Sequence, residues 1–228
     1  MDEPKKWPEL DRMSRRLLGV LVEKAKTTPD AYPMSVNALV VGSNQKQNRD
    51  PLMSVTDDEV EPGLAKLQHL GLATRITGGR VERWRHNLYE KWLVDKIELA
   101  VLAELLLRGP QTEGELRSRA SRMEPIADLD IQREKLKRLQ ERGLVKWVGE
   151  EGRRGSLVAH GFHAAGEVEA HARHVAEEPA AERAPVVERT DPALRDELTA
   201  LKTEVAALKQ TVDRVVGELA ELKRSLGA

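Results

Sequence analysis

The sequence predicts a mainly helical protein with small β wings: two tandem winged-helix domains, then a flexible linker and a carboxy-terminal parallel coiled coil. Three observations carry this prediction. Apolar residues recur at helical spacing along most of the first 163 residues. A helix-to-strand junction occurs twice, at residues 64–72 and 136–144. A heptad pattern continues without a break from Leu194 to Leu226.

The first domain is expected at residues 8–90 and begins with two helices. Apolar residues from Met13 to Leu21 recur at helical spacing, and the pattern stops at Thr27-Thr28-Pro29. Ser35 can cap a second, short helix, because its hydroxyl can accept a hydrogen bond from the first turn. A polar, irregular stretch is expected from Gly42 to Pro51.

A third helix follows in this domain. Thr56 and Glu59 form a possible capping box, and Gly71 is placed to end the helix. Pro62 cannot donate to the helical ladder, so either the helix begins near Pro62 or it is kinked there.

Two strands are expected to complete the domain. Residues 72–77 and 80–86 flank Gly78-Gly79, which is typical of a two-residue hairpin turn. Three helices followed by a two-stranded wing form the winged helix-turn-helix plan.

The same order recurs at residues 91–163, which predicts the second domain. The first expected helix carries Val94, Ile97, Val101 and Leu105, and the second begins with a capping box of Thr112 and Glu115. The third helix carries Leu136 and Leu139 and stops at Gly143. Strands are expected at Leu144–Val148 and Ser156–His160, on either side of a glycine-rich loop.

An internal repeat supports the division into two domains. Residues 64–72 align with residues 136–144, and six of these nine positions are identical or exchange Lys for Arg. Both copies lie where a third helix leads into the first wing strand. Leucines can dock such a helix on the core, and glycine lets the chain reverse into the strand.

Three segments carry a resemblance to a known family. Residues 27–37, 43–51 and 105–120 (TTPDAYPMSVN, SNQKQNRDP and LLLRGPQTEGELRSRA) resemble the signature of the YceH-like family of bacterial proteins. The resemblance covers about residues 10–163. It implies two tandem winged-helix domains and a bacterial, cytoplasmic setting, and it implies no established activity.

Composition limits the class of protein. The chain has 228 residues and no cysteine, with 33% charged and 3% aromatic residues. The lack of cysteine excludes a disulfide scaffold, a thiolate zinc site and a cysteine nucleophile. The first residues do not resemble a signal peptide, and the apolar run Leu99–Leu107 is too short to span a bilayer. We therefore expect a soluble cytoplasmic protein with no membrane partner.

Charge is distributed unevenly along the chain. The net charge is +1 for residues 1–90, +2 for residues 91–163 and −4 for residues 164–228. The part before the tail is therefore mildly basic, which permits contact with nucleic acid without demanding it.

The tail predicts a homodimer. Residues 164–190 are expected to form a linker rich in Ala, Glu and Pro, and Asp191-Pro192 is a good start for a helix at residues 191–228. Val among the a positions and Leu at most d positions favour a parallel dimer, with a trimer as the alternative. The dimerisation seam is Leu194, Leu198, Leu201, Val205, Leu208, Val212, Val215, Leu219, Leu222 and Leu226.

Charged residues beside the seam favour the parallel orientation. A parallel pair places each g position opposite the partner's next e position, whereas an antiparallel pair would set like charges against each other. The expected pairs between chains are Glu197–Lys202, Glu204–Lys209 and Glu218–Lys223.

A search for catalytic chemistry finds no candidate. The pairs His160/His163 and His171/His174 have metal-like spacing, and Glu167 and Glu178 could share a helix face with the second pair. This segment borders a linker, so we interpret it as a solvated polar face. No nucleophile elbow and no phosphate-binding glycine loop occur. We expect a protein that is no enzyme and needs no cofactor or metal.

Three basic clusters lie on parts that a winged helix normally turns toward DNA, although each alone could be a solvated face. The first domain's third helix opens with Asp57-Asp58-Glu59, which would repel phosphate, so the second domain is expected to be the main reader. The clusters are Arg75, Arg80, Arg83 and Arg85 in the first wing, Arg117, Arg119 and Arg122 on and after the second domain's second helix, and Arg133, Lys135, Lys137 and Arg138 on its third helix.

Two functions stay open at this point. The first is a dimeric protein that binds double-stranded DNA, such as a transcriptional or chromosome-associated regulator. The second is a scaffold whose winged helices dock on another protein. Recognition of single strands by stacking is disfavoured because aromatic residues are few. The polar run Asn44–Arg49 could contact a partner, but side-chain hydrogen bonds that hold the loop are favoured.

Overall fold

The computed structural model describes residues 7–79, 81–153, 155–164, 166 and 167. Contacts divide the chain into two units, residues 1–177 and 178–228, and the described residues all belong to the first. The expected coiled coil, with its seam from Leu194 to Leu226, lies outside the described residues, as does most of the expected linker.

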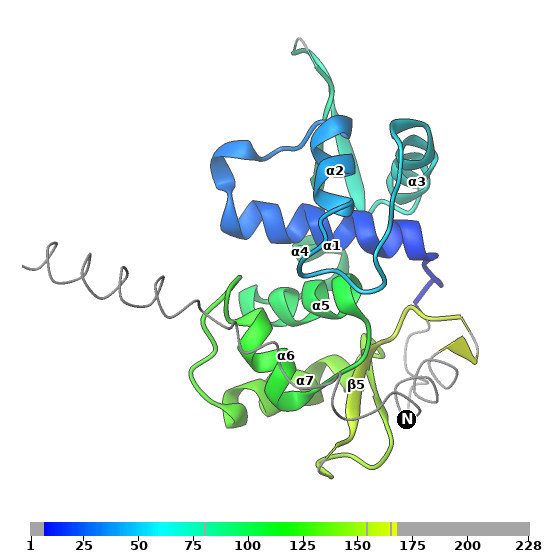
Figure 1. Ribbon diagram of the computed structural model, residues 1–228. Coiled ribbons are helices and arrows are strands. Elements are labelled where there is room, and N and C mark those ends of the chain that lie inside the picture. Colours follow the sequence, from blue (N-terminus) through cyan, green and yellow to red (C-terminus); the bar gives the residue numbers. More distant parts are fainter. Residues whose placement is uncertain (1–6, 80, 154, 165, 168–228) are drawn as a thin grey trace, which may run out of the picture. The chain divides into compact units, whose positions relative to one another are not determined.

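The described part is mainly helical, with two small antiparallel sheets (Figure 1). None of its helices is long and apolar enough to cross a membrane. Its first elements are α1 (Arg12–Thr27), a short 3₁₀ helix (Pro29–Ala31), α2 (Val36–Ser43), α3 (Asp57–His69), β1 (Ala73–Ile76) and β2 (Arg83–His86). The next are α4 (Leu88–Trp92), α5 (Lys96–Arg108), β3 (Gln111–Thr112), α6 (Glu113–Ala120), α7 (Leu129–Glu141), β4 (Val145–Val148) and β5 (Leu157–His160).

The caps predicted at Ser35, at Thr56 and Glu59 and at Thr112 and Glu115 are confirmed, whereas the helix start predicted at Asp191-Pro192 lies outside the described residues. Ser35 Oγ accepts from the N–H of Ala38 at 3.2 Å. The Glu59 carboxylate accepts from the N–H of Thr56 at 2.9 Å, which satisfies a donor at the start of α3. Pro62 lies inside α3, which begins before it at Asp57, so the alternative of a helix that begins near Pro62 is wrong.

Gly71 and Gly143 close α3 and α7 in the same way. Both adopt a left-handed backbone, with φ of +69° and +68°, respectively. L side chains rarely adopt this conformation, whereas glycine does so without steric cost. The repeated glycine of the sequence is therefore a backbone requirement at two equivalent turns.

The first hairpin differs from its prediction. The ladder between β1 and β2 ends at the pair Ile76 and Arg83, so six residues connect the strands. The prediction of a two-residue turn at Gly78-Gly79 is wrong. This end of the hairpin extends away from the helices in Figure 1, and Gly78 has no heavy atom within 4 Å of a β-carbon position. Because the tip of the hairpin does not pack on the helices, packing does not hold the two strands together as far as the glycines.

The second sheet contains a strand that the sequence did not reveal. Its order is β3–β5–β4, with both pairs antiparallel. The two-residue strand β3 precedes α6 and pairs with β5. The first half has a counterpart of the pairing between β3 and β5. Met34, just before α2, forms an antiparallel bridge with Trp84 of β2.

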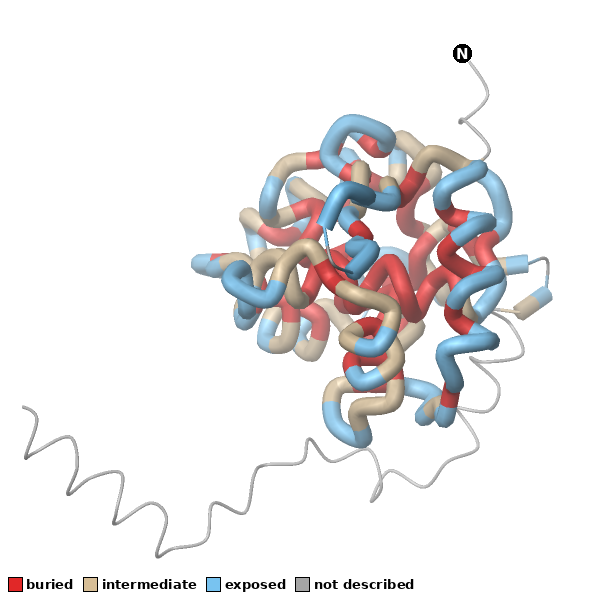
Figure 2. Tube along the Cα trace, turned by 90° about the horizontal axis from the view of Figure 1, so that it is seen from above, coloured by how far each residue is buried: buried red, intermediate tan, exposed pale blue. Residues whose placement is uncertain are grey.

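Helices α1 and α5 pack against each other at the centre of the described part. Helices α2 and α3 also contact α1, and α6 and α7 contact α5 (Figure 1). Every residue of α5 from Glu98 to Leu107 is buried. Figure 2 shows buried residues gathered in the interior, with exposed residues around them. A helix that is apolar on all sides must be covered on all sides, and α1, α6 and α7 help to cover α5.

The polar run Asn44–Arg49 serves the structure, as favoured from the sequence. Asn44 donates to the carbonyl of Val55 and accepts from its N–H. Arg49 donates to the carbonyl of Gly42 and forms a buried ion pair with Glu23 at 2.5 Å. The run ties the connection between α2 and α3 to helix α1.

The close approach of α1 and α5 generates the first prediction. A β-carbon on Gly19 of α1 would lie 2.6 Å from Cγ of Leu107, so the helices would have to shift. Gly19→Ala should lower the free energy of unfolding by about 1–2 kcal/mol, because overpacking outweighs the better helix propensity of alanine. Gly114→Ala in α6, where a β-carbon meets open space, should raise it by about 0.5–1 kcal/mol. Urea denaturation measures both, and a Gly19→Ala protein as stable as wild type would contradict the packing.

The buried ion pair generates the second prediction. Arg49→Met leaves the Glu23 carboxylate without its cation and should cost about 3 kcal/mol of unfolding free energy. The exposed pair Arg153–Glu150 provides the control, because Arg153→Met should change stability by less than about 0.5 kcal/mol. Equal costs for the two variants in urea denaturation would show that Arg49 does not hold the loop.

Candidate nucleic-acid interface

The first hairpin presents arginines on one exposed face. Trp84 is buried in β2, so its neighbours Arg83 and Arg85 point to the opposite face and are exposed. Arg83 donates to the carbonyl of Pro33 at 2.7 Å. Neither arginine has a carboxylate within ion-pair distance among the described residues.

The remaining arginines of this cluster are placed differently. Arg75 is paired with Trp84 across the ladder, so it lies on the opposite face from Arg83 and Arg85. Arg75 also forms an ion pair with Glu82 at 3.2 Å. Arg80 lies outside the described residues.

The cluster on and after α6 is engaged within the protein. Arg117 donates to the carbonyl of Ala127 at 3.2 Å, and Arg119 donates to the side chain of Gln111 at 2.7 Å. Arg122 lies 3.7 Å from the buried carboxylate of Glu104. Burial raises the pKa of Glu104, although neighbouring arginines act in the opposite direction.

Helix α7 carries the third cluster, in which one residue is unpaired. Arg133 Nε lies 3.0 Å from a Glu113 oxygen at the start of α6, and this partner raises the pKa of Arg133. Lys137 is exposed and has no hydrogen bond or ion pair with any described residue.

The other two bases of α7 face the start of α5. Lys135 Nζ lies 3.0 Å from Asp95, and Arg138 Nε lies 3.4 Å from the buried Glu98. Burial alone would raise the pKa of Asp95, but hydrogen bonds from the Glu98 N–H and from Lys135 lower it. These bases therefore already have counter-ions, and a phosphate would have to compete with them.

A groove beside each hairpin is richer in carboxylates than in bases. The groove between α3 and the first hairpin has a volume of about 530 Å³, and its charged lining is Asp58, Glu61, Glu82 and Arg75. The groove between α7 and the second hairpin measures about 250 Å³, and its charged lining is Glu113, Glu134, Glu151, Arg133 and Lys137. Neither groove attracts a phosphate backbone by charge alone.

Aromatic side chains for base stacking are scarce on the surface. Trp84 and Trp92 are buried, and Trp147 is half-buried with its indole N–H on the side chain of Gln140. Tyr89 is exposed. A platform for successive unpaired bases needs several exposed rings, and the described surface does not offer one.

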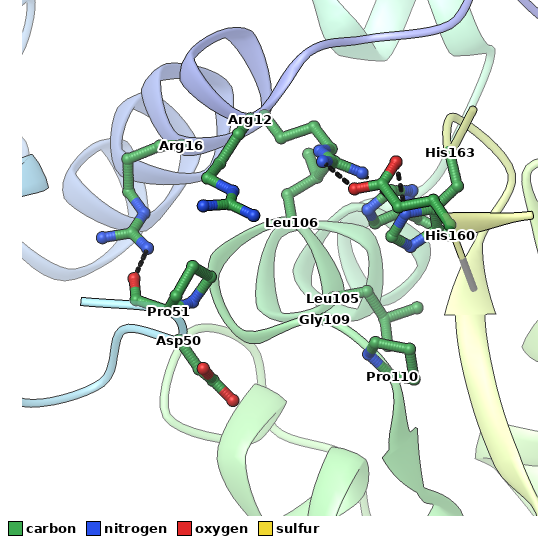
Figure 3. Close-up of a pocket in the computed structure, with 12 residues that line it drawn as sticks. Arg12, Arg16, Asp50, Pro51, Leu105, Leu106, Gly109, Pro110, His160 and His163 are labelled. Carbon is green, nitrogen blue, oxygen red and sulfur yellow. Dashed lines mark hydrogen bonds and ion pairs between the residues drawn. The ribbon is translucent and has the colours of Figure 1, made fainter. Parts of the chain in front are cut away.

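The structure also contains a concave site that sequence analysis missed. A pocket of about 280 Å³ is lined by Arg12, Arg15 and Arg16 of α1, by the end of α5 and by the segment after β5 (Figure 3). The only sequence signal is the spacing of the three arginines, which places them on neighbouring faces of one helix.

The histidines of that segment correct an expectation. His160 is buried and its ring stacks on the ring of His163, with centroids 3.7 Å apart. Glu167 forms an ion pair with Arg15, which lowers the pKa of Glu167 to about 2 against the opposing effect of burial. The interpretation as a solvated polar face is therefore wrong for these residues. His171, His174 and Glu178 lie outside the described residues.

Comparisons with known proteins place the chain among bacterial relatives. A family model described as "Protein of unknown function, DUF480" matches residues 10–154. A UPF0502 protein of Rhodopirellula baltica is 51% identical over 153 residues, 66% of this chain and 64% of the relative. Relatives from Geotalea uraniireducens and Pelobacter propionicus are 43% and 41% identical over 90% and 92% of this chain, and 95% and 97% of their own.

The two longer matches extend the predicted resemblance. It was expected to end near residue 163, but matches that cover 90% or more of the chain must include many residues beyond that position. The expected membership in a bacterial family without an established activity is confirmed. The chain belongs to the DUF480 family of proteins of unknown function, and its similar bacterial relatives carry the name UPF0502.

Proposed function

We propose that the protein is a dimeric, non-catalytic duplex DNA-binding protein that acts as a transcriptional or chromosome-associated regulator. The observation that carries this proposal is the pair Arg83 and Arg85, exposed side by side on the first hairpin without carboxylate partners among the described residues. Lys137 on helix α7 is a further base without a hydrogen bond or ion pair among the described residues. The first hairpin therefore takes the leading role, which the sequence had suggested for the second domain.

Two tandem winged helices are part of the proposal. In both halves a helix is followed by a short strand or bridge, two further helices and a hairpin. In both, the residue or strand before the second helix pairs with the second hairpin strand. Gly71 and Gly143 end the third helix of each half with the same backbone conformation. This agreement supports two copies of one plan, at residues 8–90 and 91–163.

A parallel coiled coil at residues 191–228 supplies the dimer in this proposal. Contacts from a single chain are few, because most bases of α6 and α7 already have partners. Joining two chains raises the effective concentration of the second contact surface once the first has bound. Two-fold symmetry would also favour inverted-repeat sites.

A second function is favoured by a different observation. The 530 Å³ groove beside α3 carries Asp58, Glu61 and Glu82 and could hold a basic segment of another protein. In that case the protein is a scaffold, with its winged helices as docking modules.

Loss of single arginines tests the DNA-binding proposal. Arg83→Ala and Arg85→Ala should each weaken binding to random duplex DNA and make the log–log salt dependence shallower by about one unit, because one phosphate contact is lost. Arg133→Ala is the matched control, since its guanidinium is held by Glu113, and it should change affinity less. The measurement is fluorescence anisotropy across a salt series. If the wild-type protein does not bind duplex at low salt, the scaffold function takes the place of the regulator.

A single thiol tests the dimer. The chain has no cysteine, so Ala228→Cys introduces one at the end of the expected helix. In a parallel dimer the two thiols lie close together, and mild oxidation should crosslink most of the protein, as read by non-reducing electrophoresis. An antiparallel dimer separates them by roughly 50 Å at the helical rise. Crosslinking that instead requires a mixture of Thr190→Cys and Ala228→Cys chains would refute the parallel arrangement.

A further inference from the structure

The pocket lined by Arg12, Arg15 and Arg16, the arginine pocket, contains a buried cation that forms no ion pair with a described carboxylate. The side chain of Arg16 is almost completely buried, and its guanidinium donates to the carbonyls of Ser43 at 2.8 Å and Pro51 at 2.5 Å. Its Nε is buried with no hydrogen-bond partner among the described residues. No described carboxylate lies within ion-pair distance of Arg16. A desolvated charge held by carbonyls alone is unfavourable, and an anion would relieve it.

Like charges increase the demand for an anion. Burial, and then the charge of Arg49, lower the pKa of Arg16 to about 10. Arg12 also acts against the charged form of Arg16, and it lies one helical turn away on the same face of α1. The charges of Asp50, which also lines the pocket, and of Glu23 act in the opposite direction, but neither carboxylate lies within ion-pair distance of Arg16.

Arg12 is the accessible donor of the pocket. Its side chain is exposed and has no hydrogen bond or ion pair with any described residue. Figure 3 shows it beside Arg16 without a dashed contact, whereas Arg16 reaches Pro51. Arg15, by contrast, is held by Glu167 and by Nδ1 of His163. Two guanidinium groups are therefore available to one ligand, Arg12 completely and Arg16 through its unused N–H groups.

Part of the lining of the pocket is apolar. Leu105 and Leu106 of α5 and Pro110 contribute to it, and Pro51 lies beside Arg16 (Figure 3). The volume of about 280 Å³ is close to the lower end of pockets that hold small molecules. Its walls are therefore suited to a compact molecule with a charged end and a short apolar body. The pocket suits a small molecule better than a duplex backbone, because the side chain of Arg16 is almost completely buried.

We infer that this pocket binds a small organic oxyanion, a carboxylate or a phosphate monoester. Its charged end lies between Arg12 and Arg16, and its apolar part lies against Leu105 and Leu106. The ligand would touch α1 and the connection after α2 in the first half, and α5 and the segment after β5 in the second. It would therefore act as an effector that holds both halves together. This inference goes beyond the proposed function and does not depend on DNA binding.

The experiment uses benzoate and inorganic phosphate as probes with the full-length protein. Isothermal titration calorimetry and thermal unfolding are performed at constant ionic strength, with chloride as the reference anion. At least one probe should bind with one site per chain and raise Tm above the chloride value, because a ligand that binds only the folded state stabilises it. Binding of benzoate would identify the carboxylate class with an apolar body, and binding of phosphate alone would identify the phosphate class.

Two substitutions distinguish the pocket from general anion effects. Arg12→Gln should weaken the binding of the probe on the order of tenfold or more, because a charge-assisted contact is lost. Its Tm without a probe should be unchanged, since Arg12 is exposed and contacts no described residue through a hydrogen bond or ion pair. Arg153→Gln, on the exposed tip of the second hairpin, should bind like wild type. The inference is overturned if neither probe binds at millimolar concentration, or if Arg12→Gln and Arg153→Gln bind equally well.

Discussion

The packing of α1 on α5 is the contact on which the rest of the described structure depends. Each helix is the first of its half, and each carries the other helices of that half on its remaining faces. Gly19 allows the two backbones to approach, because any larger residue would meet Leu107. The result is one core that runs through both halves. The pocket exists for the same reason, since its walls come from both sides of this contact.

Ion pairs within the second half reduce the number of its basic side chains that are available to bind a phosphate. Counting bases along the sequence identifies α6 and α7 as the basic surface, but Glu104, Glu113 and the start of α5 neutralise most of them. A cation that already has a carboxylate at about 3 Å gains less from a phosphate, because the new contact replaces an old one. The first hairpin has two arginines without a carboxylate partner among the described residues, so it supports the proposed function better than the larger cluster does.

Patterns among neighbouring residues predicted the features that depend on neighbouring residues, namely the positions and caps of the longer helices. Helical spacing and caps located α1, α3 and α5, because the first turn of each helix and its apolar face are set by neighbouring residues. Helix α4 and strand β3 were missed because five and two residues are too few for a period to be visible. Gly78-Gly79 indicated a turn but not where the strands end. The pocket could not be predicted, since Arg16, Leu106 and His163 meet only through the packing of α1 on α5.

The shared core also fixes the distance between the two hairpins of a chain. Two winged helices on a loose tether could adjust their spacing to any target, and they would lose entropy each time they did so. Here, the hairpins β1–β2 and β4–β5 grow from a single packed interior, so their separation within a chain is set before any partner arrives. For the proposed function, this arrangement means that a partner has to match the distance between the two hairpins, in addition to matching each hairpin singly.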